Sequence, residues 1–102
     1  MEYSVERDAD WVVIVLSGPI NFESIKELRE VFDRVILDGA KSVRLDLRSV
    51  PVANSAGIGS MLMFYKNLKK RGGRLEIKGI SRNLAEMFNL IKLDRVIPIR
   101  ED

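Results

Sequence analysis

The sequence contains no cysteine and no histidine, and these two absences remove several kinds of chemistry at once. Without cysteine there is no disulfide, no thiol nucleophile and no redox switch. Without histidine there is no imidazole base, so Ser-His-Asp and Cys-His catalysis are excluded. The usual zinc ligand sets are excluded too, and no close acidic cluster suggests a magnesium site. We therefore expect none of these kinds of catalysis, and no bound metal or cofactor.

The chain also lacks a long apolar segment. Its longest apolar run, WVVIVL at residues 11–16, has six residues, whereas a helix needs about 20 to span a bilayer. The first ten residues, MEYSVERDAD, are acidic and contain no apolar core of a signal peptide. We therefore expect a cytoplasmic protein that is neither secreted nor bound to a membrane.

The remaining composition is that of an ordinary globular protein, with 46% apolar and 31% charged residues. The length of 102 residues predicts one domain covering residues 1–102. The net charge of +2 hides an asymmetry: residues 1–40 hold nine acidic and four basic residues, a net −5, and residues 41–102 hold thirteen basic and six acidic ones, a net +7. The bases concentrate in KNLKKRGGR at residues 66–74, but no aromatic residue alternates with them as a nucleic-acid stacking platform requires. We expect the end of a solvated helix there and no direct DNA binding.

The hydrophobic pattern switches repeatedly between the period of a strand and that of a helix. Alternating or consecutive apolar residues predict strands, and apolar residues three and four apart predict helices. The predicted strands are residues 2–7, 11–18, 41–50, 74–80 and 95–99, and the predicted helices lie within residues 20–39, 55–71 and 81–93. Strands that alternate with such helices imply right-handed crossovers. The predicted fold is a single compact α/β domain, with a mixed, mostly parallel β-sheet and helices packed on it, in the order β-β-α-β-α-β-α-β.

Individual residues refine this fold. Residues 8–10, Asp-Ala-Asp, predict a hairpin between the first two strands. The continuous apolar character of residues 12–16 predicts a central strand covered on both faces, and Pro98 predicts that the last strand lies at an edge. Asn21 and Ser81 are the predicted N-caps of the first and third helices.

Each helix has a face predicted to pack on the core. The residues of these faces are Ile25, Leu28, Phe32, Val35 and Ile36 in the first helix, Ile58, Met61, Leu62, Tyr65 and Leu68 in the second, and Leu84, Met87, Phe88 and Ile91 in the third.

The segment ANSAGIGSM at residues 53–61 joins the third strand to the second helix and places two glycines in the first turns of that helix. Asn54 or Ser55 can cap the helix. Gly57 and Gly59 leave the first turn without side chains, so that free N–H groups and the positive end of the dipole face outward, where an anion such as phosphate is stabilised. The alternative is that these glycines serve capping and packing alone. The motifs G-x-G-x-x-G and G-x-x-x-x-G-K-[ST] are not present.

The second helix has a further unusual feature. If its core face contains Ile58, Leu62 and Tyr65, then Met63 points nearly opposite and Phe64 lies on the flank. One interpretation is that another helix covers these two side chains. The other is an apolar patch beside Ser55 for a partner protein.

These features together resemble the STAS domain family, in particular the stand-alone bacterial anti-sigma factor antagonists (anti-anti-sigma factors). Three segments, which together span about residues 11–99, carry the resemblance: VIVLSGPINFESIKELRE, SVRLDLRSVPVANSAGIGSMLMFYKNLKKRGGRLEI and GISRNLAEMFNLIKLDRVIPI. The first is similar to the family pattern L-x-G-x-[IL]-D before a helix. The second is similar to its signature, an apolar strand, D-S-[STA]-G, a helix and a Gly-Gly turn.

The resemblance implies a regulatory switch in a protein that is not an enzyme. In the family, an anti-sigma factor that is also a serine kinase phosphorylates the serine after the signature aspartate. The unphosphorylated form binds that kinase and frees a sigma factor, whereas phosphorylation ends the binding; ATP and magnesium belong to the kinase. The matching serine is Ser55, and Gly57 matches the glycine of the motif. The partner-binding residues expected on this basis are Asn21, Ala53, Asn54, Ser55, Ala56, Gly57, Met63 and Phe64.

The sequence departs from the family pattern in three places. Asn54 replaces the signature aspartate, Asn21 replaces the aspartate before the first helix, and the chain ends at Asp102, where many members have a further helix. The missing carboxylates favour an alternative function, a scaffold or interaction module in a signalling assembly without a phosphorylation cycle. A third hypothesis is a small-ligand site for an anion or nucleotide at the glycine turn. We expect a monomer or a weak homodimer.

Overall fold

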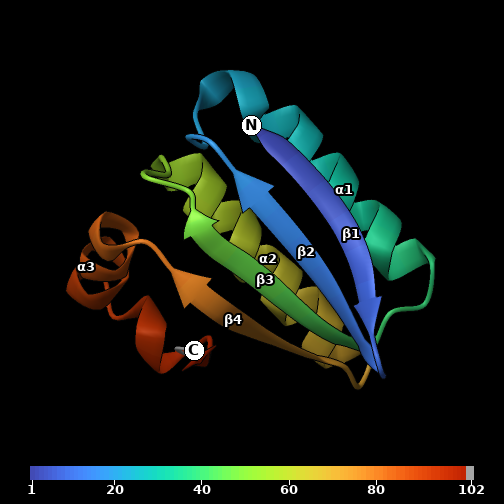
Figure 1. The fold of residues 1–102 in the computed structure, drawn as a ribbon. Helices are drawn as coiled ribbons and strands as arrows, with labels where there is room; N and C mark the ends of the chain where they lie inside the picture. The colour runs from blue at the N-terminus through green and yellow to red at the C-terminus, as the bar shows by residue number, and fades with distance from the viewer. Residues whose placement is uncertain (101–102) are drawn as a thin grey trace.

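A computed structural model describes residues 1–100 and arranges five strands in one sheet in the order β1-β2-β3-β4-β5 (Figure 1). The strands are β1 (Glu2–Asp8), β2 (Trp11–Ser17), β3 (Ser42–Ser49), β4 (Arg74–Ile80) and β5 (Ile99–Arg100). The helices are α1 (Ile25–Leu37), α2 (Ser55–Lys70) and α3 (Arg82–Leu90), with short 3₁₀ turns at Phe22–Ser24 and Leu93–Arg95. β1 pairs with β2 in antiparallel fashion, and all other pairs are parallel. The α/β class, the element order and the mostly parallel sheet are therefore confirmed.

The hairpin between β1 and β2 forms where the sequence predicts it. Residues 9 and 10 make the turn, and Ala9 has a φ of 56°. The register pairs Val5 with Ile14 and Asp8 with Trp11. Opposite residues of an antiparallel pair lie on the same face of the sheet. This register therefore determines which side chains of β1 and β2 share a face.

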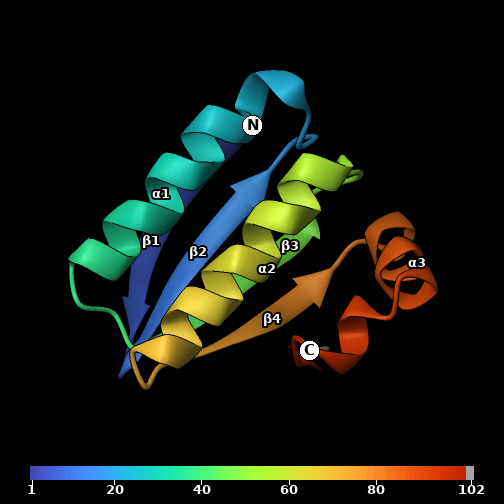
Figure 2. The same cartoon turned by 180° about the vertical axis from the view of Figure 1, so that it is seen from behind.

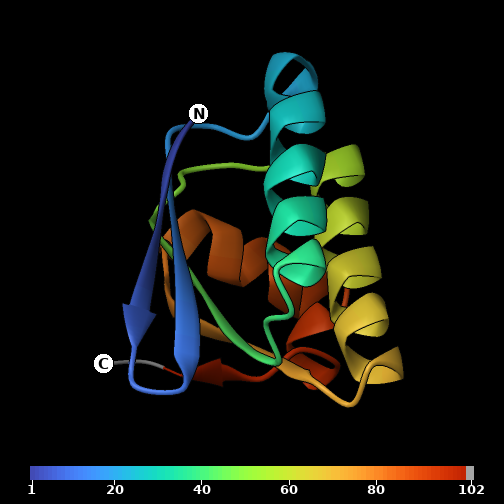
Figure 3. The ribbon, with the colours of Figure 1, turned by 90° about the vertical axis from the view of Figure 1, so that its right-hand side faces the viewer.

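The helices cover only one face of the sheet. Seen from the side, α1 and α2 lie together on one side of the strands (Figure 3), and from behind they cross in front of them (Figure 2). Val12, Ile14 and Leu16 of β2 point into this layer and are buried. The prediction that residues 12–16 are covered on both faces is wrong, because no helix among residues 1–100 lies on the other face. Val13 points to the face without helices and is nevertheless buried. It lies beside Arg44 of β3, with which it pairs.

The predicted helix faces agree with the structure to different degrees. All five predicted core residues of α1 are buried. In α2 the buried face is rotated: Ile58, Leu62 and Tyr65 are only partly buried, and the buried positions are Gly57, Ser60, Met61, Phe64 and Leu68. The reason is that α2 packs against α1 as well as against the sheet. In α3, Leu84 and Phe88 are buried and Met87 partly so, but Ile91 follows the end of the helix and is exposed.

The last strand begins later than predicted. Lys92 adopts a left-handed conformation with a φ of 62°, and the 3₁₀ segment Leu93–Arg95 follows it, so that Arg95 lies in this segment and not in the predicted strand. β5 is therefore only Ile99–Arg100. Its place at the edge of the sheet beside β4 is as predicted. The end of the chain at Asp102 lies outside the described residues.

Membrane spans and clustered metal ligands are both missing from the described chain. Among residues 1–100, no helix combines the length and apolarity needed to cross a membrane. Over the same residues, no group of three or more acidic side chains is close enough together to hold a metal ion.

Candidate functional site

Two loops meet at the carboxyl ends of β2 and β3. The backbone N–H of Gly18 donates to Ser49 O at 2.9 Å, and that of Ile20 donates to Val52 O at 2.9 Å. The N–H of Asn54 returns a bond to Ile20 O at 3.0 Å, which makes an isolated parallel bridge between Ile20 and Ala53. The two segments that resemble family motifs are thus held together by backbone hydrogen bonds at one end of the sheet.

Asn21 caps the start of the first helical segment, as predicted. Its Oδ1 accepts from the N–H of Glu23 at 3.1 Å, while Ser24 Oγ accepts from the N–H of Asn21 at 2.9 Å. This reciprocal arrangement satisfies donors that a helix start otherwise leaves free. The segment begins as a 3₁₀ turn, and α1 proper starts at Ile25.

Asn54 is the N-cap of α2, and Ser55 is the first residue of the helix. Asn54 Oδ1 accepts from the N–H of Gly57 at 2.8 Å. Ser55 is exposed, so its hydroxyl is open to another molecule. The first turn of α2 contains no acidic residue, and therefore no carboxylate offsets the positive end of the helix dipole beside this hydroxyl.

The two glycines of α2 have different explanations. A Cβ atom on Gly57 would lie 2.5 Å from Ile20 Cγ2, so residue 57 has room only for a hydrogen atom. Gly57 thereby lets α2 approach the bridge between the loops, which bears out the packing interpretation for this residue. A Cβ on Gly59 would meet nothing within 4 Å, so Gly59 is not required by close packing.

The predicted partner-binding residues separate into a surface set and a supporting set. Asn21, Ser55, Ala56 and Met63 are exposed, and Asn54 is partly buried. Ala53 and Gly57 are buried beneath that surface. Phe64, the remaining predicted partner-binding residue, does not reach this surface, because it is only 2% exposed.

Phe64 is buried because α1 covers it. Its ring stacks on the ring of Phe32, with centroids 4.2 Å apart and planes 3° from parallel. Of the two interpretations, cover by another helix and an exposed apolar patch, each therefore applies to one residue. Another helix covers Phe64, whereas Met63 remains 56% exposed.

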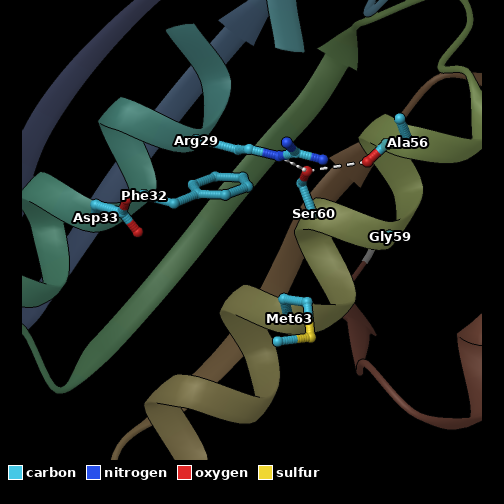
Figure 4. A pocket seen from close by; sticks show the side chains of 7 residues that line it. All are labelled: Arg29, Phe32, Asp33, Ala56, Gly59, Ser60 and Met63. Atoms are coloured by element: carbon cyan, nitrogen blue, oxygen red, sulfur yellow. Dashed lines mark hydrogen bonds between the residues drawn. The ribbon is translucent and has the colours of Figure 1, made fainter. Parts of the chain in front are cut away.

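An open groove of about 440 Å³ runs between α1 and α2 beside this surface (Figure 4). The Nε of Arg29 on α1 donates to Ser60 Oγ on α2 at 3.1 Å, and Ser60 Oγ donates to Ala56 O at 2.9 Å. Ser60 is therefore buried and satisfied, unlike Ser55. The groove is lined by Arg29, Phe32, Asp33, Ala56, Gly59, Ser60 and Met63.

Sequence reasoning missed two exposed apolar residues at the same end of the sheet. Phe22, next to Asn21, is 89% exposed, and Val52, next to Ala53, is 45% exposed. In the sequence, Phe22 is indicated by its position alone. It directly follows the N-cap Asn21 and precedes the apolar residues of α1, which start at Ile25. Large exposed apolar side chains beside an accessible hydroxyl are suited to contact with a protein.

Comparison with known proteins decides the family. The model of the STAS domain matches residues 2–102. The chain belongs to the STAS domain family. In sequence, this STAS domain is 27% identical to the anti-sigma-B factor antagonist of Listeria monocytogenes, over 93% of this chain and 83% of the relative. It is 28% identical to the anti-sigma-B factor antagonist of Bacillus subtilis, over 93% of this chain and 86% of the relative.

Solved structures of anti-sigma factor antagonists have the same fold. The anti-sigma factor antagonist from Mycobacterium paratuberculosis superimposes with a TM-score of 0.87 at 21% identity, covering 96% of this chain and 83% of that one. The Bacillus protein SpoIIAA superimposes in its unphosphorylated form with a TM-score of 0.84, and in its phosphorylated form with 0.78. Both SpoIIAA comparisons are at 19% identity over 99% of this chain, and they cover 88% and 91% of the SpoIIAA chains, respectively.

Proposed function

We propose that this STAS domain is a non-enzymatic anti-sigma factor antagonist. In this proposal it binds an anti-sigma factor that is also a serine kinase, and this binding releases a sigma factor. The observation that carries the proposal is the position of Ser55, an exposed serine at the first residue of α2, in a chain whose sequence relatives are anti-sigma-B factor antagonists. The contact surface consists of Asn21, Phe22, Val52, Asn54, Ser55, Ala56 and Met63, which we call the Ser55 surface.

The composition of the Ser55 surface supports protein binding. Phe22, Val52 and Met63 supply exposed apolar area, while Asn21 and Asn54 are held in fixed orientations by their capping bonds. Interfaces draw much of their affinity from a few large apolar side chains surrounded by polar groups. Both loops are pinned to each other through backbone hydrogen bonds, so little ordering of the backbone is required on binding.

Phosphorylation of Ser55 ends the binding in this proposal. A phosphate adds about −1.5 to −2 charges. The start of α2 carries no acidic residue and has a positive dipole end, so the folded domain accommodates the new charge. A partner that covers this surface would have to remove water from the phosphate, which is costly. The switch therefore acts on the interface and not on the fold.

Reaction with the cognate kinase tests this function. The protein is incubated with the purified anti-sigma kinase and ATP, and phosphate is mapped by tandem mass spectrometry. We expect modification at Ser55 and its loss in the Ser55→Ala variant, with Ser60→Ala as the matched control because Ser60 is buried in the same helix. Phosphate at Ser60 or Ser81 but never at Ser55 would remove the switch assignment.

A second candidate function is a STAS scaffold without a phosphorylation cycle. The observation that favours it is Asn21 and Asn54 at the two positions where the family has aspartate, since both amides keep their capping bonds but supply no carboxylate to a kinase. Size-exclusion chromatography with light scattering, with and without the kinase, separates the two functions. A stable oligomer that neither binds the kinase nor accepts phosphate supports the scaffold, whereas a stoichiometric complex with the kinase excludes it.

A further inference from the structure

The face of the sheet opposite the helices has no cover within the described chain. Figure 1 looks directly onto this face, and Figure 3 shows it edge-on. Four of the five strands pair in parallel, and parallel sheets are usually covered on both faces. The uncovered face is remote from the groove between α1 and α2 and forms no part of the Ser55 surface.

One edge of the uncovered face is acidic. The register of β1 with β2 pairs Glu2 with Ser17, Glu6 with Val13 and Asp8 with Trp11, which places the three carboxylates on this face. All three side chains are exposed. None of them forms an ion pair with a described residue.

The other half of the face is basic. Alternation along β3, β4 and β5 brings five basic side chains to the surface and two acidic ones, a net charge of +3. Glu76 lies 2.6 Å from Arg44 and 3.5 Å from Arg100, so its charge is already matched. Arg74 and Lys78 form no ion pair within residues 1–100. The seven residues are Arg44, Asp46, Arg48, Arg74, Glu76, Lys78 and Arg100.

An apolar strip on β2 separates the two halves. It consists of Trp11, Val13 and Val15, which alternate with the buried residues of the helix side. The guanidinium carbons of Arg44 and Arg74 lie 4.0 Å and 4.3 Å from the centroid of the Trp11 ring. These cation–π contacts hold the ring and both arginines in place.

We infer that the uncovered face binds the same face of a second copy of this chain, around a twofold axis parallel to the strands and between β2 and β3. A rotation of 180° about that axis places β1 of each copy opposite β4 of the other. The acidic edge then meets the basic half twice, because a twofold interface repeats every contact. Both halves of a complementary charge pattern are thus present on one chain.

The register supplies a specific contact for this arrangement. Asp8 pairs with Trp11, Trp11 with Ser42, and Ser42 with Arg74, so these residues form one row across the sheet. Rotation about an axis parallel to the strands keeps each residue in its row. Asp8 of one copy therefore faces Arg74 of the other. Glu6 lies in the row of Val13, Arg44 and Glu76 and faces Glu76, whose charge is matched by Arg44 and Arg100, so that Glu6 meets a cluster with a net charge of +1.

The same pattern argues against other occupants. A nucleic acid would meet the carboxylates of β1 and those of Asp46 and Glu76, which repel it. An acidic partner protein would be repelled by β1 in the same way. Exposed ion pairs contribute little individually and are screened by salt, so the predicted dimer is weak and sensitive to ionic strength.

Analytical ultracentrifugation of the full chain tests this inference, with measurements over a range of protein concentrations in about 50 mM and about 500 mM salt. The wild-type protein is expected to form dimers at low salt and to dissociate at high salt. Asp8→Arg and Arg74→Glu, each alone, are expected to weaken dimerisation by about tenfold or more, since two contacts become repulsive. An equimolar mixture of the two variants is expected to dimerise again. In the mixed dimer, positions 8 and 74 carry opposite charges at both of their contacts.

Control variants distinguish the loss of this contact from unfolding and from a general effect of charge. Lys66→Glu changes an exposed charge on α2, on the helix side, and is expected to leave dimerisation unchanged. Thermal unfolding of each variant checks the fold. If Arg74→Glu unfolds, the test rests on Asp8→Arg, which changes an exposed residue of the edge strand. A wild-type monomer at every concentration in low salt would overturn the inference, as would Asp8→Arg dimerising like the wild type. Binding of a poly-glutamate peptide to a monomeric protein would assign the face to an acidic partner and overturn it equally.

Discussion

Ile20 occupies the space that a side chain at residue 57 would need: a Cβ on Gly57 would lie 2.5 Å from Ile20 Cγ2. Ile20 belongs to the loop after β2, and Gly57 to the first turn of α2. Their contact holds the start of α2 against the bridge between Ile20 and Ala53. The orientation of Ser55 therefore depends on a glycine two residues later.

Gly57→Ala is expected to lower the free energy of unfolding by about 1–3 kcal/mol, because overpacking at a buried contact forces the backbone or Ile20 to move. Urea unfolding measures this change. Gly59→Ala is the matched control in the same helix. A Cβ at Gly59 meets nothing within 4 Å, so this substitution is expected to stabilise the protein by about 0.5–1 kcal/mol. Equal effects of the two substitutions would show that the contact with Ile20 does not explain Gly57.

Phe64→Ala is expected to cost about 3–5 kcal/mol, because it removes a buried aromatic side chain and its stacking partner Phe32 loses that contact. Met63→Ala, at the preceding residue, is expected to change stability by less than about 0.5 kcal/mol because Met63 is exposed. Thermal and urea unfolding of the pair give the comparison. If both variants were equally stable, α1 would not cover Phe64 in solution.

The cap of α2 gives a third prediction. Asn54→Ala removes the acceptor for the N–H of Gly57 and is expected to cost about 1 kcal/mol. Asn54→Asp keeps an acceptor and adds a negative charge at the helix start, which is expected to stabilise by about 0.3–1 kcal/mol at low ionic strength. Denaturation at low and high salt measures both variants. An Asn54→Ala protein as stable as the wild type would contradict the capping role.

Phe22 offers a test of the Ser55 surface that avoids Ser55 itself. Phe22→Ala is expected to leave stability nearly unchanged, since the side chain is 89% exposed. It is expected to weaken binding to the cognate anti-sigma factor by about tenfold or more if Phe22 is an anchor of the interface. Isothermal titration calorimetry gives the affinity. Leu37→Ala, at an exposed residue at the far end of α1, is the control, and an equal loss in both variants would argue against the proposed surface.

The sequence predicts the elements of this fold better than it predicts which faces are covered. α1 has a single apolar stripe, so its core residues were identified correctly. α2 carries apolar residues around most of its circumference and packs on two neighbours, so periodicity alone did not give its orientation, and Phe64 was misplaced. The apolar run at residues 12–16 predicted cover on both faces because Val13 and Val15 are apolar too, yet on that face Val13 lies beside Arg44 and not beneath a helix.

The candidate site was partly predictable, from the position of the segment before α2 and from the family resemblance. The loops after β2 and β3 meet because adjacent parallel strands end at the same edge of a sheet, whereas the sequence grouped Asn21 with Ser55 only through the family resemblance. The groove between α1 and α2 was not predictable, because Arg29 and Ser60 are 31 residues apart in the chain. The left-handed conformation of Lys92 was not predictable either, because nothing in the residue type indicates it.

The affinity of the cognate anti-sigma factor for the protein before and after phosphorylation of Ser55 tests the central claim most directly. Calorimetric titration of both forms, with folding checked by circular dichroism, gives the comparison. We predict tight binding of the unphosphorylated form and a loss of binding by about a hundredfold or more in the phosphorylated form, with the same fold in both. Equal affinity of the two forms would contradict the account.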